Sequence, residues 1–124
     1  MSYRAYFPER GDLVHLNFSP SAGHELADRH YAIVLSPGSY NRKTGMAVIC
    51  GITSRIRGGP FEVAVPPDLL PEKRGTGRIA SIILADAVRQ IDYRERETEY
   101  VGKAPRALLE EVLDTLFAVL EPDD

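Results

Sequence analysis

Residues 11–54 read GDLVHLNFSPSAGHELADRHYAIVLSPGSYNRKTGMAVICGITS, and predicted strands in this stretch decide the fold. Apolar and polar side chains alternate in residues 13–18, which is the period of a strand with one buried face. Residues 31–35 are continuously apolar and end at the turn sequence SPG, a pattern typical of a central strand buried on both faces. Residues 46–53 predict a further strand, so the stretch sets a polar loop beside two buried strands.

The remaining sequence extends this sheet and ends in a helix. Residues 61–65 and 78–84 predict two more short strands, and such a series favours a curled antiparallel sheet. After Pro105, apolar residues recur every three or four positions as far as Leu120, with acidic residues opposite, which predicts an amphipathic helix. We expect its apolar stripe to pack on the sheet or to form a subunit contact; binding in the groove of a partner is a further alternative. No repeat or linker interrupts the chain, so we expect residues 1–124 to form a single domain.

Composition indicates an intracellular globular protein. The chain has 124 residues, of which 44% are hydrophobic, and this is enough for a modest core. Cys50 is the single cysteine and lies in an apolar run, as in a protein that stays reduced. The sequence contains neither a signal-like N-terminal segment nor an apolar span of membrane length. We therefore expect a cytoplasmic protein that does not contact the membrane.

Charge is distributed unevenly along the chain. The net charge of −3 argues against a general attraction to nucleic acid. Residues 42–78 nevertheless form a net basic segment, and two interpretations of it stay open: a groove for a polyanion, or solvated loop charge. The basic residues of this segment are Arg42, Lys43, Arg55, Arg57, Lys73, Arg74 and Arg78.

Common metal and nucleotide motifs are absent from the sequence. The three histidines lack the spacing of a zinc site and Cys50 has no cysteine partner, so we expect neither a metal nor a cofactor. No phosphate-binding glycine loop or nucleophile elbow is present. What remains is a group of polar residues at the ends of two strands that should be neighbours: residues 25–30, and residues 53–55.

These strand-end residues suit cleavage of RNA without a metal. RNA supplies its own nucleophile, the 2′-hydroxyl, so an enzyme needs a base, an acid and positive charge for the phosphorane. His30 could transfer protons, Arg29 or Arg55 could supply charge, and the hydroxyl of Thr53 could donate to a phosphate oxygen. The structural alternatives are a surface His–Arg pair and a threonine that caps the strand end.

The order of GDLVHLNFSPSAGHE, RHYAIVLSPGSYNRKTGMAVICGIT, GGPFEVAVP and LADAVRQIDYRER is similar to the MazF/PemK family of toxin endoribonucleases, over nearly the whole chain. The resemblance implies a mostly β fold, an SH3-like antiparallel β-barrel with a C-terminal amphipathic helix. It also implies a homodimeric mRNA interferase that causes growth arrest by metal-independent, sequence-selective cleavage of single-stranded RNA, leaving a 2′,3′-cyclic phosphate. A cognate antitoxin would occupy the active groove, and operator DNA would be bound only through that antitoxin.

Family site residues carry over by position. The catalytic threonine falls on Thr53 and the loop glutamate on Glu25, whereas the position of the catalytic arginine falls on His30 and the arginine has moved to Arg29. We therefore predict His30 as the general acid and base, Arg29 as the charge stabiliser and Thr53 as the phosphate donor. The residues predicted to shape the RNA groove are Ser19, His24, Glu25, Ser54 and Arg55.

Other departures from the family pattern concern His15, Gly51 and Ala87. His15 stands where an aromatic residue is common, and we interpret it as a packing position on the exposed face of its strand. Gly51 replaces a frequent proline, and Ala87 replaces a frequent glutamine, so base selection is expected to differ. The displaced arginine also motivates an alternative from another class: a non-catalytic degenerate toxin that serves as an antitoxin-binding or DNA-autoregulatory partner, or a topoisomerase-binding toxin on the same barrel.

Overall fold

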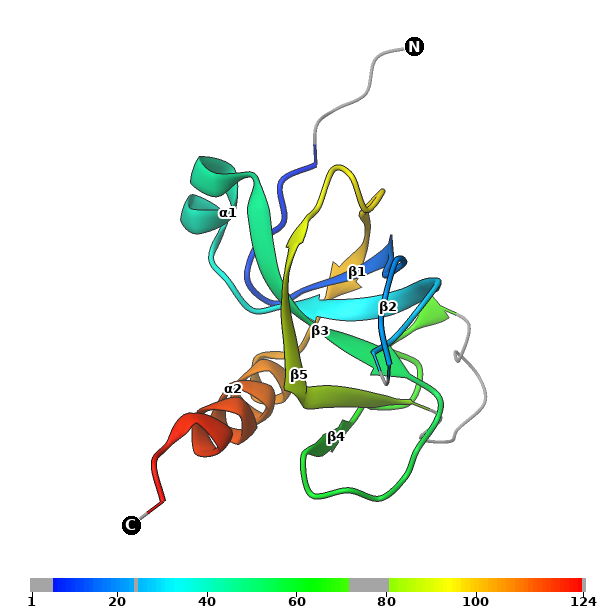
Figure 1. The fold of residues 1–124 in the computed structure, drawn as a ribbon, viewed down its shortest axis with the longest axis vertical. Helices are drawn as coiled ribbons and strands as arrows, with labels where there is room; N and C mark the ends of the chain where they lie inside the picture. Colours follow the sequence, from blue (N-terminus) through cyan, green and yellow to red (C-terminus); the bar gives the residue numbers. More distant parts are fainter. Residues whose placement is uncertain (1–5, 24, 72–80, 124) are drawn as a thin grey trace.

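A computed structural model describes residues 6–23, 25–71 and 81–123, and its main feature is one curled antiparallel sheet (Figure 1). The strands lie in the order β4-β5-β3-β2-β1-β6. Their bounds are β1 (Asp12–Asn17), β2 (Arg29–Val34), β3 (Met46–Thr53), β4 (Glu62–Ala64), β5 (Ile82–Asp92) and β6 (Glu99–Lys103). The helices are α1 (Gly38–Thr44) and α2 (Arg106–Leu120), and neither is long and apolar enough to cross a membrane. The predicted fold class, a mostly β antiparallel structure with a C-terminal helix, is confirmed; within the described ranges β4 and β6 remain the two edges of the curled sheet.

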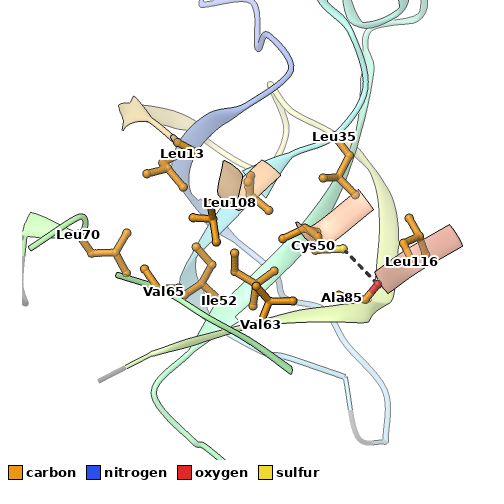
Figure 2. Packing of buried hydrophobic residues seen from close by; sticks show 14 residues of the cluster. Leu13, Leu35, Cys50, Ile52, Val63, Val65, Leu70, Ala85, Leu108 and Leu116 are labelled. Carbon is orange, nitrogen blue, oxygen red and sulfur yellow. Dashed lines mark hydrogen bonds between the residues drawn. The ribbon is translucent and has the colours of Figure 1, made fainter. Parts of the chain in front are cut away.

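The sheet is buried on both faces because its central strands carry apolar residues at successive positions. Ile33 of β2 belongs to a core cluster that also includes Leu108, Val112 and Leu116 of α2. Figure 2 shows this cluster filling the space between the sheet and α2. Ala32 and Val34 of the same strand belong to a second cluster on the opposite face, with Val14, Leu16, Phe18, Ala47, Ile49, Ile91 and Tyr93. The prediction that residues 31–35 form a central strand buried on both faces is therefore confirmed.

Strand β5 bends sharply, and the sequence prediction for this strand was wrong in its bounds. Its pairing with β3 shifts between Cys50 and Ile52, so residues 84–87 of β5 face the single Gly51 of β3. Such a bulge bends a strand, and Figure 1 shows β5 turning from one direction of the curled sheet to another. The strand predicted at 78–84 begins at Ile82 and runs to Asp92. Its second half was missed because most of that half is exposed and carries no continuous apolar run. Residues 78–80 lie outside the described residues.

Gly51 also fixes where the loop after β1 lies. A Cβ atom at Gly51 would sit 2.4 Å from Cδ1 of Leu26 and 3.3 Å from the ring of Phe18. Since glycine has no Cβ, residue 26 can pack directly on β3. The glycine that replaces the family's frequent proline is thus a packing site for the loop at residues 18–28.

A buried asparagine joins α1 to the rest of the fold. The Nδ2 of Asn41 donates to the carbonyl oxygens of Pro8, at 2.7 Å, and Ser36, at 3.0 Å. Its backbone carbonyl accepts from the hydroxyl of Tyr93 at 3.0 Å, and its side chain is fully buried. Because buried polar groups cost free energy when unpaired, this amide stabilises the fold by donating to two buried carbonyl groups.

We predict that Asn41→Ala lowers the free energy of unfolding by about 3 kcal/mol, because it leaves two buried carbonyl oxygens without a donor. Urea denaturation measures this difference. Lys43→Ala, on the exposed side of the same helix, is the matched control and should change stability by less than about 0.5 kcal/mol. Equal effects of the two substitutions would contradict the role given to the buried amide.

Cys50 lies in the core, where its thiol contacts the carbonyl oxygen of Ala85 at 3.9 Å (Figure 2). Burial, with a smaller contribution from Asp86, raises the pKa of the Cys50 thiol to about 12. A thiol with this pKa is almost entirely protonated at neutral pH, and the thiolate is the reactive form. We predict that a thiol reagent at pH 8 fails to label the folded protein within minutes and labels it fully in denaturant. Rapid labelling of the folded protein would contradict the described burial.

Candidate functional site

A pocket of about 130 Å³ lies where the end of β3 meets the beginning of β2. Tyr31 of β2 pairs with Ile52 of β3, so the two strand ends are neighbours, as the sequence predicted. The residues that line the pocket are His15, Arg29, His30, Tyr31, Ile52, Ser54, Leu70 and Ser81. The pocket has room for a small anionic group or part of one nucleotide.

Arg29 is the permanent positive charge of this pocket. It is the first residue of β2, and strand alternation places it on the same face as Tyr31. Its Nε lies 3.3 Å and its Nη2 3.2 Å from Nδ1 of His15. The same Nη2 donates to Oε1 of Glu99 at 3.1 Å and to the carbonyl oxygen of Glu97 at 3.4 Å. The guanidinium is therefore held between β1 and β6.

His30 borders the pocket, but its ring belongs to the other face of the sheet. The residue pairs with Leu16, and its ring meets the ring of Phe18 edge-on, with centroids 5.9 Å apart. The imidazole makes no hydrogen bond to another residue in the described ranges. As expected from strand alternation, the displacement of the arginine by one residue separates Arg29 and His30 onto opposite faces.

At the end of β3, Ser54 lines the pocket and Thr53 does not. Thr53 is half-buried, and its Oγ1 accepts a hydrogen bond from the backbone N–H of Arg55 at 3.2 Å. This is the strand-end cap that stood as the structural alternative, although a hydroxyl that accepts can still donate. Ser54 is exposed and lines the pocket, whereas neither Thr53 nor Arg55 is among its lining residues.

Glu25 and Ser19 stabilise the loop after β1 and do not line the pocket. The carboxylate of Glu25 accepts from the backbone N–H of Ala22 at 2.7 Å. The hydroxyl of Ser19 accepts from the N–H of Asp28 at 2.7 Å, next to a backbone bond from Phe18 to Asp28. His24, also predicted to shape the RNA groove, lies outside the described residues.

Those members of the net basic segment that the structure describes do not form one groove. Arg42 and Lys43 belong to α1, before β3 begins, and Arg42 pairs with Glu9 at 2.7 Å. Arg55 and Arg57 follow the opposite end of β3. Lys73, Arg74 and Arg78 lie outside the described residues. The described positions therefore support the interpretation as solvated loop charge.

Sequence reasoning missed His15 and Glu99 as members of the site. His15 packs against a neighbouring ring, as predicted, but it is half-buried, lines the pocket and contacts Arg29, which the sequence did not indicate. Its ring lies 4.7 Å from the ring of Tyr31. The register of β1 against β2, which pairs residue 15 with residue 31, is the signal that could have identified it. Glu99 was missed because β6 was not predicted.

Comparison with known proteins shows a similarity to one toxin family over most of the chain. Residues 9–120 match the family model described as "PemK-like, MazF-like toxin of type II toxin-antitoxin system". The chain is 40% identical over 104 residues to Endoribonuclease toxin MazF of Escherichia coli K12, covering 83% of this chain and 86% of that protein. It is 33% identical over 114 residues to Endoribonuclease toxin ChpB of the same organism, covering 91% and 94%.

Solved structures agree with the sequence matches. A crystal structure of MazF from Deinococcus radiodurans has a TM-score of 0.83 and 42% identity, covering 94% of this chain and 98% of that one. A MazE–MazF structure from the same organism has a TM-score of 0.77 and 37% identity, covering 96% and 100%. The predicted resemblance is confirmed: this chain belongs to the PemK-like, MazF-like toxins of type II toxin–antitoxin systems.

Proposed function

We propose that this chain is an endoribonuclease toxin that cleaves single-stranded RNA in the cytoplasm and is inhibited by a cognate antitoxin. Relatives at 40% and 33% identity carry the name endoribonuclease toxin, and the MazE–MazF structure is 37% identical to this chain. The observation that carries the proposal is that Arg29, His30 and Ser54 line one pocket. Their side chains carry a guanidinium, an imidazole and a hydroxyl.

The proposed reaction is an internal transfer that needs no metal. A base removes the proton of the 2′-hydroxyl, and O2′ attacks the adjacent phosphorus while negative charge develops on the non-bridging oxygens. The bond from phosphorus to O5′ then breaks, and the departing O5′ takes a proton from an acid. The products are a 2′,3′-cyclic phosphate and a 5′-hydroxyl end.

We assign these steps to the residues named from the sequence. Arg29 neutralises the developing charge, because a guanidinium stays protonated and can hold two phosphate oxygens. His30 serves as base and then as acid; since its ring packs against Phe18 on the other face of the sheet, this assignment requires the first residues of β2 to bend when RNA binds. Thr53 and Ser54 donate hydroxyl hydrogen bonds to phosphate. The proposed contacts along the bound RNA are Ser19, His24, Glu25 and Arg55.

We predict that purified protein cleaves a long single-stranded RNA in the presence of a chelator and leaves cyclic-phosphate ends. Arg29→Ala should lower the rate by about 10²- to 10³-fold, as expected when one charge-stabilising donor is lost. His30→Ala and Thr53→Ala should each abolish growth arrest with the fold retained. End-group analysis of the RNA and circular dichroism measure these outcomes, and Lys43→Ala should behave as wild type.

The same assay separates the enzyme from the alternative class. A protein that binds an antitoxin but leaves RNA intact under all conditions would be a degenerate toxin or a topoisomerase-binding one. Restoration of cleavage only after a divalent metal is added would reject the metal-independent mechanism. Full activity of both Arg29→Ala and His30→Ala would reject the assignment of residues to the pocket.

We also propose that the toxin is a homodimer and that the end of α2 contributes to the contact. Phe117 is 54% and Leu120 67% exposed, although both belong to the apolar stripe of the helix. Large apolar side chains at a surface favour association. Light scattering should give twice the mass of one chain, and Phe117→Asp should shift the protein toward monomer. A wild-type monomer at micromolar concentration would contradict this proposal.

A further inference from the structure

The guanidinium of Arg29 makes its hydrogen bonds through Nε and Nη2, and Nη1 is available for a ligand. Its Nε and Nη2 contact His15, and Nη2 also contacts Glu97 and Glu99. Nη1 makes no hydrogen bond to another residue within the parts of the chain that the structure describes. Since a phosphate oxygen accepts from guanidinium N–H groups, Nη1 is the position at which Arg29 can take a ligand without losing its present partners.

The contact with Arg29 determines the protonation form of His15. Arginine only donates hydrogen bonds, so Nδ1 of the imidazole must accept and cannot carry a proton. The proton of the neutral ring then resides on Nε2. In this form the free lone pair of His15 is already occupied by Arg29, so this imidazole does not act as a general base while the contact persists.

His15 is better suited than Glu99 to fix the direction of the guanidinium. Glu99 is 73% exposed in its side chain, and exposed ion pairs restrain their partners weakly. His15 is half-buried, and its ring lies 4.7 Å from that of Tyr31, on the strand that begins with Arg29. The imidazole is therefore held by the sheet itself and presents a fixed acceptor to Nε and Nη2.

We infer that His15 is a positioning residue: its Nδ1, assisted by Glu99, holds Arg29 so that Nη1 is presented to a scissile phosphate. This role rests on the proposed RNA cleavage and deepens it. It explains how an arginine displaced by one residue can still serve the pocket. The alternative for the same side chain is a stacking surface for a nucleobase, formed by its ring together with Tyr31.

Two substitutions separate the acceptor from the ring. His15→Asn keeps an acceptor atom near the position of Nδ1 and removes the ring, whereas His15→Phe keeps a ring against Tyr31 and removes the acceptor. We expect His15→Phe to lower kcat about 10- to 100-fold with little change in KM, because misplacement of a charge stabiliser affects the transition state. We expect His15→Asn to stay within about threefold of wild type.

Other outcomes overturn the inference. Active His15→Phe with inactive His15→Asn would show that the ring matters, as for stacking on a base. Wild-type rates in both variants would remove His15 from the site. A wild-type protein without RNA cleavage would defeat the proposed function and this role together, whereas cleavage that persists in His15→Phe defeats this role alone.

A spectroscopic measurement tests the contact independently of activity and of the folding of the two His15 variants. The ¹⁵N shifts of the His15 imidazole in the wild-type protein at neutral pH should show the neutral form with the proton on Nε2. In Arg29→Ala the ring should relax to a mixture of neutral forms or gain a proton. An imidazolium, or a proton on Nδ1, in the wild-type protein would overturn the inference.

Discussion

The pairing of β2 with β1 on one side and β3 on the other is the constraint on which the rest of the structure depends. This pairing sets Tyr31 opposite both His15 and Ile52. It thereby determines, for each residue of β2, which of the two faces of the sheet its side chain occupies. Successive side chains of a strand point to opposite faces, so a shift of one residue cannot be absorbed within a regular strand. Arg29 consequently joins the face of His15, and His30 joins the face of Phe18.

Sequence patterns predicted the parts of the fold that have a strong period. The strand at residues 46–53 has the predicted bounds, and the helix after Pro105 buries Leu108, Val112 and Leu116 as its spacing indicates. The second half of β5 and all of β6 were not predicted, because most of their residues are exposed and they carry no continuous apolar run. Their position depends on tertiary pairing, which no local period reveals.

The candidate site was predictable only in part for a related reason. Residue types at the strand ends identified Arg29, His30 and Ser54, which border one pocket. His15 and Glu99 reach Arg29 from strands on its other side, and their contribution follows from register alone. Thr53 is the opposite case: the sequence predicted it for the site, but its Oγ1 accepts a local hydrogen bond from the backbone N–H of Arg55.

The loop at residues 18–28 is closed at its neck by a backbone bond from Phe18 to Asp28 and by the hydroxyl of Ser19. These bonds lie immediately before Arg29, so the position at which β2 begins does not depend on the exposed residues of the loop. Substitutions at exposed loop positions such as Ala22 and Ala27 touch neither this closure nor the packing of Leu26 on Gly51. Evolution can thus vary what the exposed residues of the loop recognise while the guanidinium of Arg29 keeps its place.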